Sequence, residues 1–143
     1  MFKNRNLAWL IIVLALLATA CEASTMAGIR GPAKIHFGCT LSEDGLSILD
    51  ETNQFHLTDP IVTLVDLGIP FPRAGLEEMI SRMEPRGEYV MHKEPIDVPP
   101  GAGSIMNADF KPWVISLLGP GHYKVRIIQG DTVLAEGDFE LIE

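Results

Sequence analysis

The residues in this chain with the greatest capacity for chemistry are two cysteines and four histidines. The histidines are dispersed along the sequence at His36, His56, His92 and His122. No two of them have the spacing that places both on one helix face, and none belongs to a recognised metal-ligand motif. We therefore expect neither a metal site nor a cofactor.

Nucleophiles and carboxylates also lack a catalytic arrangement in the sequence. No Gly-x-Ser-x-Gly motif occurs, and no serine has an adjacent base. Glu77 and Glu78 are neighbours, so on a strand they face opposite sides and cannot act as a pair. Cys39 lies at an inward position of an expected strand, where a thiol is usually inert. The sequence predicts a protein that is not an enzyme.

The other cysteine, Cys21, follows an N-terminal segment with the three parts of a bacterial export signal. The segment has a positively charged start, an apolar run over 7–17 and small residues directly before the cysteine. The apolar run is shorter than the roughly 20 residues needed to span a bilayer. We predict a signal peptide over 1–20, with cleavage between Ala20 and Cys21.

The sequence Leu-Ala-Thr-Ala-Cys at 17–21 resembles the lipobox of bacterial lipoproteins, although that family prefers leucine where Ala18 stands. The resemblance implies that the Cys21 sulfur receives a diacylglyceryl group and that Cys21 becomes the new N-terminus. Glu22, which is not aspartate, implies location at the outer membrane where the cell has one. In a cell with a single membrane it implies the outer face of the plasma membrane.

Ordinary secretion is the alternative, because Ala18 and Ala20 also satisfy the small-residue rule for signal cleavage. In that case Cys21 and Cys39 could form a disulfide in an oxidising compartment. A buried core helix over 7–17 is disfavoured by the charges that precede it. Small and turn-forming residues over 21–33 predict a flexible tether that reaches roughly 20 Å.

Composition limits the partners of the remaining chain. About 110 residues, 34–143, are the usual size of one domain. Of the 11 lysines and arginines, Lys3 and Arg5 lie in the predicted signal, so nine remain against 19 aspartates and glutamates. This acidic balance excludes a nucleic-acid partner and direct adsorption to an anionic membrane surface. Membrane attachment is therefore expected through lipid on Cys21.

Alternation of apolar and polar residues predicts a series of short strands in this domain. The expected strands are 34–41, 61–67, 88–93, 104–110, 123–129 and 133–142. Gly130 and Asp131 form a two-residue turn between the last two. The segment 76–83 is ambiguous, because its apolar residues have helical spacing while its turn-rich surroundings favour a strand.

Several segments together resemble the small immunoglobulin-like domains of bacterial envelope lipoproteins of unknown function. They are Phe55, Pro70, Phe71, Leu76, the Gly-x-Tyr strand within 119–127 and the Leu-Ala-Glu-Gly-x-Phe strand within 130–139. The resemblance implies a strand over 76–83 and brings no catalytic residues. The predicted fold class is all-β, an Ig-like antiparallel β-sandwich over 34–143.

These features predict a lipid-anchored, extracytoplasmic binding module of the bacterial cell envelope. Its partner would be another envelope protein or a glycan. The alternative is an inhibitor or accessory of an envelope protease or hydrolase, secreted or anchored. We expect Trp113 in the core, where a single tryptophan of a sandwich usually lies, and the alternative is an exposed anchor for a partner. We expect the loops 70–73 and 99–103 on display, where recognition usually occurs.

Overall fold

The computed structural model describes residues 31–143. The predicted signal peptide, the cleavage position between Ala20 and Cys21, the lipid site at Cys21 and most of the tether lie outside the described residues. Among the described residues, no helix has the length and apolar character needed to cross a membrane.

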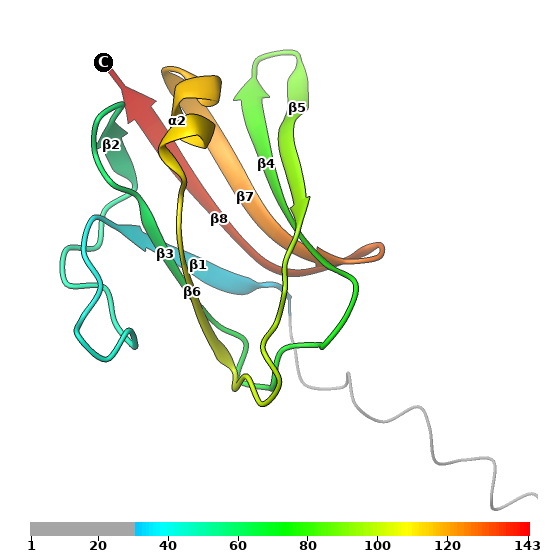
Figure 1. Ribbon diagram of the computed structural model, residues 1–143. Helices are drawn as coiled ribbons and strands as arrows, with labels where there is room; N and C mark the ends of the chain where they lie inside the picture. Colours follow the sequence, from blue (N-terminus) through cyan, green and yellow to red (C-terminus); the bar gives the residue numbers. More distant parts are fainter. Residues whose placement is uncertain (1–30) are drawn as a thin grey trace, which may run out of the picture. The chain divides into compact units, whose positions relative to one another are not determined.

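Eight strands and one short helix make up residues 31–143 (Figure 1). Their bounds are β1 Ala33–Gly38, β2 Gln54–His56, β3 Val62–Asp66, β4 Leu76–Glu84, β5 Gly87–Pro95, β6 Ile105–Asp109, α2 Pro112–Leu118, β7 Gly121–Gln129 and β8 Thr132–Ile142.

The strands follow one path of pairing, β5-β4-β7-β8-β1-β3-β6, which curls so that its two halves face each other. β1 connects the halves, because Ala33 and Lys34 pair in parallel with β8 while 35–38 pair antiparallel with β3. β2 also pairs in parallel with β8. In the lettering of immunoglobulin domains, one half corresponds to strands C′CFG and the other to ABE. The predicted Ig-like sandwich is confirmed.

The ambiguous segment 76–83 is a strand, as the resemblance implied. β4 pairs with β5 on one side and with β7 on the other. Both edges of its backbone are therefore hydrogen-bonded, which outweighs the helical spacing of its apolar side chains. The predicted hairpin is also confirmed, since Gln129 pairs with Thr132 across Gly130 and Asp131. Gly130 has a φ of 57°, which glycine adopts without strain.

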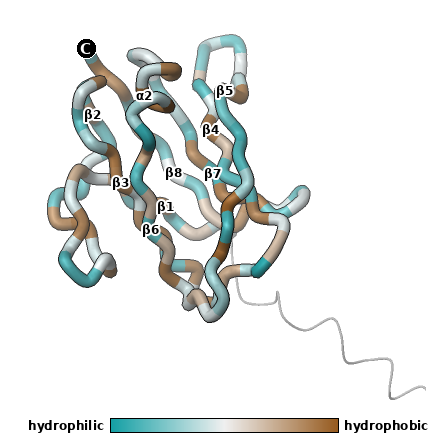
Figure 2. Tube along the Cα trace, viewed as in Figure 1, coloured by the Kyte–Doolittle hydropathy of each residue, from teal (hydrophilic) through white to brown (hydrophobic). Residues whose placement is uncertain are grey.

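The core is built around Phe139 in β8. Its ring stacks on Tyr123 with a centroid distance of 5.4 Å, and Phe37, Phe55 and Phe110 pack around it at 5.4, 6.3 and 5.7 Å. These rings come from both halves of the sandwich, so one aromatic cluster joins them. Figure 2 shows hydrophobic and hydrophilic positions following one another along the strands.

Tyr123 also fixes the corner that leads into β7. Its ring is fully buried, and its hydroxyl donates to the backbone carbonyls of Leu118, at the end of α2, and of Gly119, at 2.8 Å. A tyrosine near the start of this strand, bonded to the backbone a few residues upstream, is the tyrosine corner of immunoglobulin folds. The contact satisfies carbonyls that the helix end leaves without intrahelical partners.

The prediction that Trp113 lies in the core is wrong. Pro112 starts α2, a position for which its fixed φ is suited, and Val114, Ile115 and Leu118 form the buried side of the helix. Helical geometry then turns Trp113 and Leu117 outward, where they are 52% and 53% exposed. The Trp113 ring lies edge-on to His92 of β5, with 5.3 Å between centroids.

Replacing Tyr123 with phenylalanine is expected to destabilise the domain by about 1–3 kcal/mol, because two carbonyls lose their buried donor. Chemical unfolding followed by fluorescence measures the change. Tyr89→Phe is the control, since Tyr89 is 48% exposed. Equal stabilities for Tyr123→Phe and the unchanged protein would contradict the role assigned to this hydroxyl.

Candidate binding cleft

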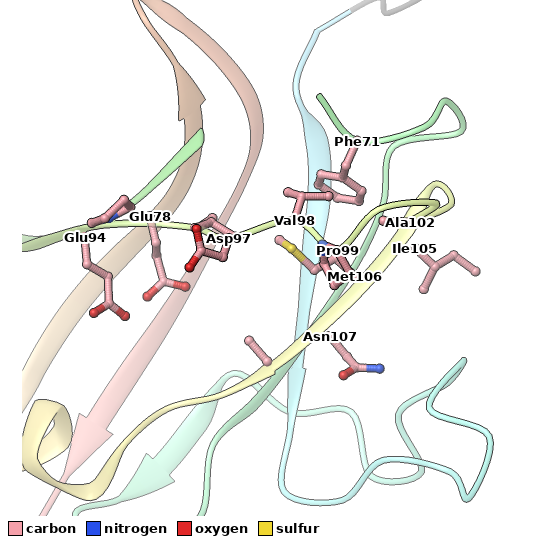
Figure 3. Close-up of a pocket in the computed structure, with 13 residues that line it drawn as sticks. Phe71, Glu78, Glu94, Asp97, Val98, Pro99, Ala102, Ile105, Met106 and Asn107 are labelled. Carbon is pink, nitrogen blue, oxygen red and sulfur yellow. The ribbon is translucent and has the colours of Figure 1, made fainter. Parts of the chain in front are cut away.

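A cleft of about 500 Å³ opens between the end of β5 and the strand β6. Its volume is within the usual range of ligand pockets. Figure 3 shows carboxylates at one end of the cleft and mainly apolar side chains at the other. The acidic end is formed by Glu78, Glu94 and Asp97. The apolar end is formed mainly by Phe71, Val98, Pro99, Ile105 and Met106.

The two loops expected on display meet at the apolar end. The backbone N–H of Phe71 donates to the carbonyl of Gly103 at 3.1 Å, which holds 70–73 against 99–103. Pro99 and Gly103 are exposed, whereas the Phe71 ring is buried and forms part of the cleft. Both loops therefore border the cleft, but the expectation that they are on display is wrong for Phe71, which is buried.

Glu78 is on the inward-facing side of β4, between the buried residues Leu76 and Ile80. The register of β4 and β5 places Glu94 directly opposite Glu78. Burial raises the pKa of the Glu78 carboxyl, and the charge of Glu94 raises it further, against smaller opposing effects of His92 and Lys111. Like charges directly opposite one another on a sheet are unfavourable.

Glu94 has one nearby basic group on its own strand. Nε2 of His92 lies 3.5 Å from Oε2 of Glu94. The same ring contacts Trp113, so the acidic end of the cleft continues toward the exposed side of α2. Asp97 follows β5 and is the carboxylate of the acidic end that lies nearest the apolar end (Figure 3).

This arrangement suits the binding of a ligand with a cationic group and an apolar part. A cation at the acidic end would reduce the repulsion between Glu78 and Glu94, and it would be attracted more strongly there than in open solvent. Phe71, Val98 and Met106 offer apolar surface beside it.

The four histidines lie at four separate places. His36 contacts Glu51 at 2.7 Å, His56 contacts the main-chain oxygen of Glu143 at 2.7 Å, and His122 lies 3.5 Å from Glu140, while His92 is beside the cleft. Within residues 31–143, no three histidine, cysteine, aspartate or glutamate side chains gather as metal ligands would.

Cys39 lies just beyond the end of β1 and not within the expected strand 34–41. It is partly buried and packs against the core. Burial raises the pKa of its thiol, with a further contribution from the charge of Asp50. The raised pKa keeps Cys39 in its less reactive thiol form.

Sequence reasoning missed the pairing of Glu78 with Glu94. It separated Glu77 from Glu78 correctly, since Glu77 forms an ion pair with Lys93 at 2.7 Å. The alternation Leu76, Glu78, Ile80 contained a signal, because a carboxylate occupies an inward position of the strand. Which residue lies opposite Glu78 depends on the register between β4 and β5, and a bulge after Ile80 shifts that register.

Comparison with known proteins supports the fold. No protein-family model matches the chain, and no curated protein matches it. An immunoglobulin-like protein from Pseudomonas aeruginosa, known from its crystal structure, is similar with a TM-score of 0.51 and 20% sequence identity. The similarity covers 85% of this chain and 100% of that one. This likeness concerns the fold alone.

Replacing Glu78 with glutamine is expected to raise the thermal unfolding temperature at about pH 7 but to change it little near pH 4. The raised pKa means that the folded state keeps the Glu78 proton to a higher pH than the unfolded chain does. The stability gained from this proton is fully present below the ordinary pKa of glutamate. It is lost as the pH rises through the raised pKa that Glu78 has in the folded protein.

Thermal unfolding of the two proteins across this pH range measures the effect. Glu77→Gln is the matched control, because Glu77 is adjacent but faces the opposite side and its exposed ion pair contributes little. Parallel pH profiles for Glu78→Gln and Glu77→Gln would contradict the burial assigned to Glu78.

Proposed function

We propose that this protein is a binding module of the bacterial cell envelope, held at a membrane by lipid on Cys21. Residues 1–20 direct its export, and the residues between Cys21 and the start of β1 at Ala33 act as a tether. The folded domain acts by holding a partner and not by catalysing a reaction. The same proposal assigns the protein to the envelope lipoproteins that carry an Ig-like domain.

The cleft between β5 and β6 is the observation on which the binding role rests. Its lining combines carboxylates with apolar side chains, which is a composition suited to recognition. The residues that line it include no serine, cysteine or histidine that could serve as nucleophile or base beside Glu78. A raised carboxyl pKa at this position is accounted for by burial and by Glu94.

The orientation of the domain supports a role at the end of a tether. The chain enters the domain at Ala33, the start of β1, and the α2 corner lies at the opposite end of the sandwich (Figure 1). A domain attached through its N-terminal side can therefore present the exposed side of α2 to a partner. The acidic surface charge leaves lipid as the means of membrane attachment.

Intact mass spectrometry of the protein from the membrane fraction tests the anchor. We expect a chain that begins at Cys21 and carries the mass of a diacylglyceryl group. Cys21→Ser is expected to lose this increment, because serine has no sulfur to form the thioether. Cys39→Ser is the matched control and is expected to keep it.

A soluble and unmodified product that begins at Cys21 would contradict lipid attachment. A Cys21–Cys39 disulfide in that product would identify the protein as secreted without an anchor.

A further inference from the structure

One edge of β6 has no strand paired to it within residues 31–143. β3 occupies the other edge, where the N–H of Leu67 donates to the carbonyl of Ser104 and the N–H of Phe110 donates to the carbonyl of Ile61. Antiparallel ladders alternate, so the backbone groups of Ile105, Asn107 and Asp109 point away from β3. These groups form a free row along the edge of the sandwich.

The free edge of β6 borders the cleft. Four consecutive residues, 105–108, line the cleft, although side chains of a strand alternate between its two faces. The cleft therefore reaches around the edge of the strand. A ligand in the cleft is therefore next to unpaired backbone N–H and C=O groups of β6. These are the groups to which an added strand forms hydrogen bonds.

β5 also has a free edge, but it is less suited to an added strand. A bulge interrupts its register after Ile80, and Lys93 and Pro95 lie near its end. Bulges, lysines and prolines are features that discourage strand addition at an edge. β6 carries no such feature between Ile105 and Asp109 and pairs with β3 in continuous register.

The opposite wall of the cleft determines the charge of the occupant. Glu78 and Glu94 come from β4 and β5, and Asp97 comes from the segment after β5. The basic groups that face them are His92 of β5 and Lys111, which precedes α2. The negative charge of the three carboxylates therefore exceeds the positive charge of the basic groups near them. A basic side chain of a bound partner would complement this excess.

We infer that the cleft binds an extended segment of a partner protein, which adds a strand to the free edge of β6 and places a lysine or arginine among Glu78, Glu94 and Asp97. This inference specifies the partner of the proposed binding module but does not depend on its lipid anchor. β6 has five residues and spans about 17 Å, enough to pair with a segment of similar length. Alternate residues of the segment face the cleft.

Isothermal titration with a capped peptide of alternating lysine and valine tests the inference. The protein is purified from whichever cell fraction contains it, so the outcome is independent of the mass measurement on Cys21. We expect binding that weakens as salt is raised, and no binding of the peptide with glutamate in place of lysine.

Two protein variants locate the basic side chain. The double variant Glu78→Gln with Glu94→Gln is expected to weaken peptide binding about tenfold or more, because the lysine loses its charged partners. Glu77→Gln is the matched control and is expected to leave the affinity unchanged. The double variant removes the unfavourable pairing of two carboxylates, so its fold is expected to persist, and thermal unfolding verifies this.

N-methylated peptides test the added strand without altering the protein. Alternate amides of a strand point to opposite edges, so methylation of one alternate set is expected to abolish binding while the other set is tolerated. Equal affinity of both methylated peptides would overturn strand addition. Spermidine that binds as tightly as the peptide, or unchanged affinity in the double variant, would overturn the inference as well.

Discussion

The structure depends on the contacts that Phe139 makes at the centre of the sandwich. Tyr123 stacks on this ring from the neighbouring strand β7, and Phe37, Phe55 and Phe110 approach it from β1, β2 and the segment before α2. Aromatic side chains bury large apolar areas, so one cluster of five rings stabilises both halves of a domain of modest size. The Tyr123 hydroxyl extends the cluster to the backbone of the α2 corner, which positions the helix on the sandwich.

A core concentrated at this point leaves the opposite side of the sandwich less complete. There β4 begins and β5 ends, and the segment from Ile96 to Ser104 crosses between the two halves without forming a strand. The crossing leaves one edge of β6 unpaired and leaves the inward position of Glu78 open to a cleft. A partly buried carboxylate opposite a second carboxylate lowers stability, and a position that lowers stability is consistent with selection for binding.

The fold was predictable because its strands are encoded locally. The alternation at Tyr123, Val125 and Ile127 and the turn at Gly130 indicate β7, β8 and their hairpin without any knowledge of distant residues. α2 was missed because a seven-residue helix gives too few turns for a recognisable period, although Pro112 marked its start. Trp113 was assigned to the core from the general burial of tryptophan, whereas a single helical turn decides which side it faces.

The sequence by itself determined the strand pattern, the hairpin turn and the all-β class, because each depends on neighbouring residues and on backbone preferences. It also carries the predicted signal and Cys21, which lie outside the described residues. Only the tertiary structure decided that Glu94 lies opposite Glu78 and that the edge of β6 is free. These features depend on which strands pair and in which register, and that choice arises from packing between residues far apart in the chain.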